Sequence, residues 1–170
     1  MKNIFLFIAL SFFISSCVAQ KVQSGAYNTM LKSMLKNDVP ELTVDQADSI
    51  QLANSNVIFI DTREKKEFEV SHIRDAVWVG YDDFDLKRVK QIDKSNKIIA
   101  YCSVGARSED VTRKLIEAGY TDVSNLYGSI FEWVNQGKPV YDSEGEETLK
   151  VHAYSKAWGV WLKKGEKVFD

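Results

Sequence analysis

Short apolar runs alternate with amphipathic segments along most of the chain. The runs with the length and composition of buried strands are residues 57–60, 76–79, 97–101 and 123–126. Apolar spacing and local composition predict helices at residues 26–35, 43–53, 65–70, 83–92, 108–118 and 129–136. Apolar strands that alternate with helices are typical of a mostly parallel sheet that is buried on both sides. The pattern therefore predicts an α/β domain with helices on both faces of a central sheet.

The ends of several predicted helices carry recognisable signals. Thr43 and Gln46 have the spacing of a capping box, which predicts that a helix begins there. Gly119 follows residues 108–118, and Gly137 follows residues 129–136. Glycine readily adopts the left-handed backbone conformation that commonly ends a helix. We therefore expect these two helices to stop at the glycines.

The overall composition is that of a globular protein. The chain has 170 residues, of which 45% are hydrophobic and 27% charged, and its formal net charge is −2. This length fits one domain with short extensions. Because there is no excess of basic residues, nucleic acid is not expected as a partner.

The N-terminal residues have the features of an export signal. Lys2 precedes an apolar run at residues 4–14, which is shorter than the roughly 20 residues of a membrane-spanning helix. Such a run suits a secretory signal peptide. The small residues before Cys17 resemble a bacterial lipobox, which predicts removal of residues 1–16 and lipidation of Cys17. Cleavage after Ala19 is the alternative, and both place the mature protein outside the cytoplasm, in a bacterial periplasm, the first as a membrane-anchored lipoprotein.

Cys102 is the single thiol that remains once Cys17 is lipidated or removed. It follows the predicted strand at residues 97–101 and precedes the predicted helix at residues 108–118. Ligands of such sheets bind beyond the carboxyl ends of the strands, and the N–H groups and dipole of a following helix stabilise a thiolate. The position favours a nucleophile, although a buried cysteine can also serve as a small apolar side chain.

The residues after Cys102 suit an anion. Ser103, Val104, Gly105 and Ala106 allow the backbone to curl, so the N–H groups of residues 103–107 are expected to form an anion-binding nest. The guanidinium of Arg107 is expected to contact the substrate anion. Ser108 is predicted to cap the following helix. Together these features predict a nucleophilic thiolate below a pocket for an anionic substrate.

Several ordered motifs make residues 41–142 resemble the rhodanese (sulfurtransferase) domain family. The matching segments are Asp61-Thr62-Arg63 with Glu67-Phe68 and His72-Ile73, residues 101–108, residues 117–120, residues 123–133 and residues 137–140. The chain departs from the family pattern at Ser71 and Asp75, where glycines are usual, and at Gly80, where proline is common. None of the three departures touches the cysteine loop.

The resemblance implies a rhodanese-like α/β fold with a mostly parallel sheet of about five strands. It also implies a sulfurtransferase in which Cys102 takes sulfane sulfur from thiosulfate or a related anionic donor. A thiol, cyanide or a protein would accept the sulfur from the Cys102 persulfide, and no metal or organic cofactor is implied. The alternative is a non-catalytic module that binds or senses sulfur species or docks a partner protein.

Loop length separates this reading from the cysteine phosphatases and related arsenate reductases. Those enzymes bind a phosphate-sized oxyanion in a loop with five residues between cysteine and arginine. Here four residues separate Cys102 from Arg107. The tighter loop favours a sulfur atom over a tetrahedral phosphate.

Two further parts of the chain carry expectations. Asp61 and Arg63 could shape the pocket rim, but a structural ion pair with Glu67 or another carboxylate is favoured. Residues 17–40 are predicted to form a linker and a helix before the domain. Residues 143–170 are predicted to pack back on the domain as a strand and a short helix starting at Ser155, because their apolar side chains are too many to leave in water. A docking surface for a partner is the alternative for this extension.

Overall fold

The computed structural model of the protein describes residues 21–53 and 56–170. The predicted signal peptide at residues 1–16, the lipidation site Cys17 and the alternative cleavage site after Ala19 lie outside the described residues. Within the described ranges, every helix is too short or too polar to span a bilayer.

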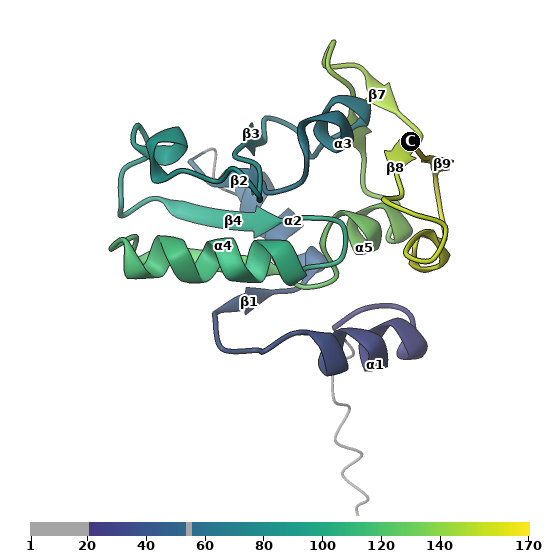
Figure 1. Ribbon diagram of the computed structural model, residues 1–170, viewed down its shortest axis with the longest axis horizontal. Coiled ribbons are helices and arrows are strands. Elements are labelled where there is room, and N and C mark those ends of the chain that lie inside the picture. The colour runs from purple at the N-terminus through teal and green to yellow at the C-terminus, as the bar shows by residue number, and fades with distance from the viewer. Residues whose placement is uncertain (1–20, 54–55) are drawn as a thin grey trace, which may run out of the picture.

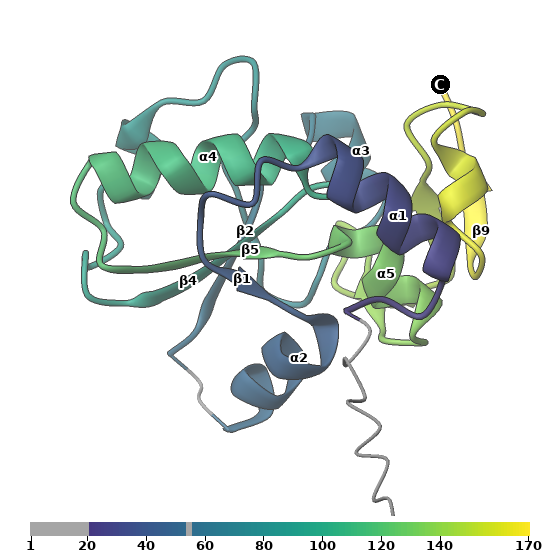
Figure 2. The ribbon, with the colours of Figure 1, turned by 90° about the horizontal axis from the view of Figure 1, so that it is seen from below.

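Five parallel strands form the central sheet, in the order β1-β5-β4-β2-β3. Figure 1 labels β1, β2, β3 and β4, and Figure 2 labels β5 beside β1 and β4. They are β1 (Glu41–Leu42), β2 (Ile58–Asp61), β3 (Val77–Trp78), β4 (Lys97–Tyr101) and β5 (Asp122–Leu126). The middle strand β4 pairs with β2 and β5, and its last four residues are buried. The predicted α/β fold with a mostly parallel sheet is confirmed.

Helices cover both faces of this sheet (Figure 2). On β4, Ile98 and Ala100 pack in one apolar cluster with α4 (Ala106–Glu117). Ile99 and Tyr101 pack in the other, with α2 (Val44–Ala53) and α5 (Ser129–Asn135). Successive side chains of a strand point to opposite faces, so a continuous apolar strand needs an apolar layer on each side.

The remaining elements lie at the edges and ends of the domain. They are α1 (Gly25–Met34), α3 (Lys65–Val70), the 3₁₀ helices η1 (Leu86–Val89) and η2 (Gly159–Trp161), and the short strands β6 (Val140–Tyr141), β7 (Glu147–Thr148), β8 (Lys150–His152) and β9 (Glu166–Val168). Strand β6 pairs antiparallel with β7, and β8 pairs parallel with β9.

The prediction of a helix at residues 83–92 is wrong, because only the short 3₁₀ helix η1 forms there. The side chain of Asp85 accepts a hydrogen bond from the N–H of Lys87, and Arg88 donates to the carbonyl of Val79 and to Asp83. Side chains that bind nearby backbone in this way compete with a regular helix.

The helix after the cysteine loop begins earlier than predicted. Helix α4 starts at Ala106, and Gly105 occupies the N-cap position with φ of 127°. Ser108 therefore lies inside the first turn and does not cap the helix. Its hydroxyl instead lies 2.7 Å from Asn125 Oδ1 and 3.1 Å from the carbonyl oxygen of Gly105.

The C-terminal extension lies against the domain. Val151, Ala153 and Leu162 are fully buried in the cluster that also contains residues of α2 and α5. The predicted helix starting at Ser155 is reduced to one turn, in which the Ser155 carbonyl accepts from the N–H of Gly159 at 2.7 Å, followed by η2. The preceding residue, Tyr154, has φ of 63°, which is outside helical geometry.

Asp61 and Arg63 form an ion pair at the end of β2. Arg63 Nη2 lies 2.6 Å from Asp61 Oδ2, and both side chains are fully buried. Arg63 also donates to the carbonyl of Ser71 at 2.6 Å. The pair holds the turn that leads into α3, and because it is sealed from solvent neither residue forms a pocket rim.

We expect Asp61→Ala to destabilise the fold strongly, because it leaves the buried guanidinium of Arg63 without its counter-charge. Loss of one partner of a buried ion pair typically costs about 3–5 kcal/mol of unfolding free energy. Asp83→Ala is the matched control, since Asp83 pairs with Arg88 at the surface with a side chain 63% exposed. Urea unfolding of the two variants would contradict this interpretation if their midpoints fell equally.

Candidate functional site

Residues 102–105 form the loop between the end of β4 and the start of α4, at the carboxyl edge of the sheet. The N-terminus of α5 holds this loop. The N–H groups of Ile130 and Phe131 donate to the carbonyls of Cys102 and Ser103, each at 3.2 Å. The N–H of Cys102 donates to Ser129 Oγ at 3.1 Å. Because C=O and N–H point in opposite directions in a trans peptide, the N–H groups that follow these two carbonyls point away from α5.

Gly105 completes the turn around the sulfur atom. Its N–H donates to Cys102 Sγ at 3.1 Å. Its carbonyl accepts from Asn125 Nδ2 at 3.1 Å and from the N–H of Glu109 at 3.0 Å. The φ of 127° is strained for any residue with a side chain, so this position requires glycine.

The surroundings of Cys102 favour the thiolate. Burial raises the pKa of the thiol, since the residue is 1% exposed. The charge of Arg107, the N–H and hydroxyl of Ser108 and the N–H of Gly105 lower the pKa, and they outweigh burial, so it lies below its ordinary value. Gly105 belongs to the predicted nest of residues 103–107, and Ser108, at the third position of α4, is an additional partner of the sulfur that the prediction did not include.

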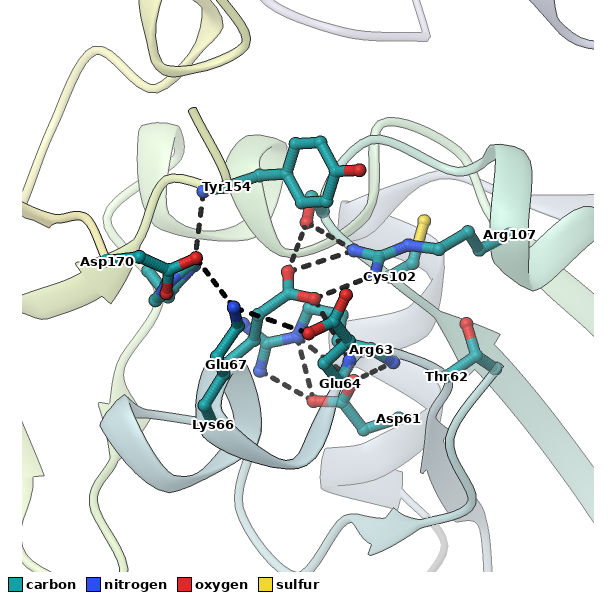
Figure 3. A network of polar contacts seen from close by, with 12 residues as sticks. Asp61, Thr62, Arg63, Glu64, Lys66, Glu67, Cys102, Arg107, Tyr154 and Asp170 are labelled. Carbon is teal, nitrogen blue, oxygen red and sulfur yellow. Dashed lines mark hydrogen bonds and ion pairs between the residues drawn. The ribbon is translucent and has the colours of Figure 1, made fainter. Parts of the chain in front are cut away.

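Arg107 is bound by the carboxylate of Glu67, which the sequence analysis considered only as a structural ion-pair partner beside Arg63. Its Nη1 and Nη2 donate to the two carboxylate oxygens of Glu67 at 2.7 and 2.9 Å (Figure 3). Nη2 also donates to Ser103 Oγ at 2.9 Å. Burial raises the pKa of Glu67, but the hydrogen bond and charge of Arg107 outweigh it, so the pKa lies below its ordinary value. Glu67 is thus ionised at neutral pH, and it offsets the positive charge that was expected to face the substrate.

A pocket of about 150 Å³ lies above the sulfur. Its lining residues are Met34, Cys102, Ser103, Val104, Ala106, Arg107, Tyr154 and Trp158. Five of the predicted site residues are in this list, whereas Gly105, Asp61 and Arg63 are not. Gly105 acts through its backbone, as described above.

The sequence analysis missed two groups of site residues. Met34, Tyr154 and Trp158 lie outside residues 41–142, and their apolar character indicated only burial. Glu67, Asn125 and Ser129 lie between or within the family motifs, where a charged or polar side chain next to apolar strands is a signal of a buried role. In residues 21–53 and 56–170, no group of three histidine, cysteine or acidic side chains could hold a metal ion.

A model of a protein family matches more than half of the chain. The rhodanese-like domain model matches residues 43–136. The chain belongs to the rhodanese-like domain family. The match contains the cysteine loop, the Glu67 segment and the N-terminus of α5, so the family region holds the sulfur and its polar partners.

Relatives with assigned activities fall into two kinds. The chain is 31% identical over 107 residues to a sulfurtransferase of Allochromatium vinosum, which covers 60% of this chain and 99% of the relative. It is 27% identical over 124 residues to a tRNA uridine(34) hydroxylase of Hamiltonella defensa, which covers 70% of this chain and 33% of that protein. The chain thus spans about a third of the length of the hydroxylase.

Solved structures share the fold at low sequence identity. The thiosulfate sulfurtransferase from Pseudomonas aeruginosa aligns with a TM-score of 0.58 and 19% identity, over 84% of this chain and 26% of that chain. A rhodanese-related protein from Thermoplasma volcanium aligns with a TM-score of 0.52 and 20% identity, over 59% of this chain and 96% of that chain. These likenesses show the rhodanese-like architecture.

We expect Glu67→Gln to lower the pKa of Cys102 further, because the charge of Arg107 is then no longer offset. The amide keeps the size of the side chain and can still accept the N–H of Glu64 that Glu67 accepts at 3.0 Å. The pH dependence of alkylation by iodoacetamide measures this pKa. Glu69→Gln, on the exposed side of the same helix, is the control and should leave the curve in place. If the pH dependence of alkylation were the same for both variants and the unmodified protein, Glu67 would not offset the charge of Arg107 at Cys102.

Proposed function

We propose that the protein is a sulfurtransferase that carries sulfane sulfur as a persulfide on Cys102. The observation that carries the proposal is the position of Sγ, which borders the pocket while the Gly105 N–H points at it from 3.1 Å. The lowered pKa of the thiol favours the thiolate, which is the nucleophilic form of cysteine. The likeness to the sulfurtransferase of Allochromatium vinosum, which covers nearly all of that relative, supports the same chemistry.

The first half of the reaction transfers one sulfur atom to the enzyme. With thiosulfate as the donor, the Cys102 thiolate attacks the outer sulfur and forms a new S–S bond. The bond between the two sulfur atoms of thiosulfate breaks, and its electron pair leaves with sulfite. Thiolate and dianion together carry three negative charges, as do the persulfide anion and sulfite, so no oxidant or proton is required.

The second half regenerates the thiolate. A nucleophilic acceptor, such as cyanide or a thiolate, attacks the outer sulfur of the persulfide and leaves with it, as in other covalent double-displacement cycles. The N–H groups of Gly105 and Ser108 stabilise the negative charge on Cys102 Sγ, which is the leaving atom of this step. Neither half requires a metal ion or an organic cofactor.

We expect the protein to gain the mass of one sulfur atom when it is incubated with a sulfane-sulfur donor. Intact-mass spectrometry should show the gain on the unmodified protein and its removal by cyanide. Cys102→Ser should show none, and it keeps the size of the side chain. A folded protein that gains no sulfur from thiosulfate or from an organic thiosulfonate would favour the non-catalytic binding module.

We also propose that the protein is exported and anchored by a lipid on Cys17, on the basis of the apolar run at residues 4–14 and the small residues before Cys17. When the full chain is made in a Gram-negative host, its mature form should begin at a lipidated Cys17 and sediment with membranes. A soluble periplasmic chain that begins at Gln20 would support the alternative cleavage. An unprocessed cytoplasmic chain would overturn the proposal.

A further inference from the structure

Three separate parts of the chain build the pocket above Cys102. Met34 comes from the last turn of α1, and Val104 and Ala106 come from the cysteine loop and the start of α4. Tyr154 and Trp158 come from the C-terminal extension. Apart from Cys102 and its polar neighbours in the loop, the lining side chains are therefore apolar or aromatic.

Contacts with α4 fix the part of the pocket wall that α1 contributes. The carboxylate of Glu109, on α4, accepts the N–H groups of Lys36 at 3.0 Å and Asn37 at 2.8 Å. Glu109 is only 3% exposed, so these bonds are shielded from water. They hold the chain directly after Met34 and thereby keep Met34 at the pocket.

The wall contributed by the extension is also fixed. Nδ1 of His152 accepts the N–H of Tyr154 at 3.2 Å, and Nε2 lies 3.0 Å from Asp170 Oδ1. Lys66, on α3, donates to the same carboxylate at 2.6 Å. The ring of Tyr154 lies over the guanidinium of Arg107, 5.2 Å from it (Figure 3). Tyr154 is thus in contact with Arg107 at the start of α4 and is connected to α3 through His152 and Asp170.

The charges around the pocket disfavour a dianion. Arg107 is the one cation among the lining residues of this pocket, and Glu67 binds it through both carboxylate oxygens. With Cys102 ionised, these three side chains carry a net charge of −1, since one positive charge meets two negative ones. A donor with less charge and an apolar group meets less repulsion and gains the contact with the walls.

The size of the pocket suits one ring. Its volume is about 150 Å³, and an apolar cavity of about 150 Å³ in another protein binds benzene. From the walls, the charge balance and this volume, we infer that the preferred donor is a small organic thiosulfonate or persulfide whose ring or short apolar chain packs against Met34, Tyr154 and Trp158. The inference rests on the proposed sulfurtransferase function and names its substrate class.

The transfer step keeps the same balance as with thiosulfate. A thiosulfonate, R–SO2–S⁻, gives its outer sulfur to the Cys102 thiolate and leaves as the sulfinate R–SO2⁻. A persulfide, R–S–S⁻, gives its outer sulfur and leaves as the thiolate R–S⁻. In both cases one S–S bond forms, one bond to sulfur breaks, and the leaving group keeps the electron pair.

Two donors with the same charge and the same reacting group test the inference. Benzenethiosulfonate carries a phenyl group where methanethiosulfonate carries a methyl group. To correct for intrinsic reactivity, the rate at which each donor sulfurates Cys102 is divided by its rate with free cysteine. We expect the corrected ratio of kcat/KM to favour the aromatic donor at least tenfold, as burial of a ring in an apolar site predicts. A ratio near one would overturn the inference while leaving the proposed function intact.

Substitutions in the C-terminal extension test whether Trp158 causes the preference for the aromatic donor. Trp158→Ala should bring the corrected ratio close to one, and Trp158→Phe should restore most of it. Val160→Ala is the matched control from the same extension, because Val160 is 49% exposed and does not line the pocket. A ratio that survives Trp158→Ala would contradict the assignment of the aromatic wall.

A second readout does not depend on turnover. Benzenesulfinate should slow alkylation of Cys102 by iodoacetamide at concentrations where methanesulfinate has no effect, since it occupies the ring site. If no donor sulfurates Cys102, the proposed function fails, and this protection still decides whether the pocket binds a ring. Equal behaviour of the two sulfinates would overturn the inference.

Discussion

The site depends on the hydrogen bonds between the cysteine loop and the N-terminus of α5. Two N–H groups of α5 bind the carbonyls of Cys102 and Ser103, and the hydroxyl of Ser129 binds the N–H of Cys102. These contacts orient the peptide planes of the loop, and Asn125 from β5 fixes the carbonyl of Gly105. With both ends of the turn held, the Gly105 N–H meets the sulfur without further rearrangement, which is the preorganisation that stabilises an anion in a buried site.

The guanidinium of Arg107 faces both the sulfur of Cys102 and the carboxylate of Glu67, so it is not a free cation for binding an anion. Arg107 stabilises the thiolate, and Glu67 holds the guanidinium in one orientation while it offsets its charge. Ser103 is shared by both, since its hydroxyl donates to Glu67 and accepts from Arg107. A buried guanidinium needs such partners, because an unpaired charge in this environment is costly. The arrangement favours the thiolate form of Cys102 and leaves no uncompensated positive charge at Arg107.

The terminal segments outside the family match line the pocket as well as packing against the domain. The family model spans residues 43–136, and it contains the sulfur and its polar partners. Met34, Tyr154 and Trp158 lie outside it and shape the space in front of the sulfur. In the proposed function, the shared domain carries the chemistry and the extensions of this chain select the molecules that fit the pocket. Function resides in the site and its walls, not in the fold alone.

The sequence by itself determined the parallel sheet, most of its helices and the position of Cys102 at the edge of the sheet. These follow from local patterns, since an apolar run such as residues 97–101 is stable only when both faces are covered. Local side-chain capping overrode the helix predicted at residues 83–92. The tertiary structure alone decided that Glu67 binds Arg107, 40 positions away in the chain, and that Met34 and Trp158 meet above one sulfur atom. Such contacts depend on how distant elements pack, and the spacing of residues along a chain does not encode which buried charges or apolar side chains become neighbours.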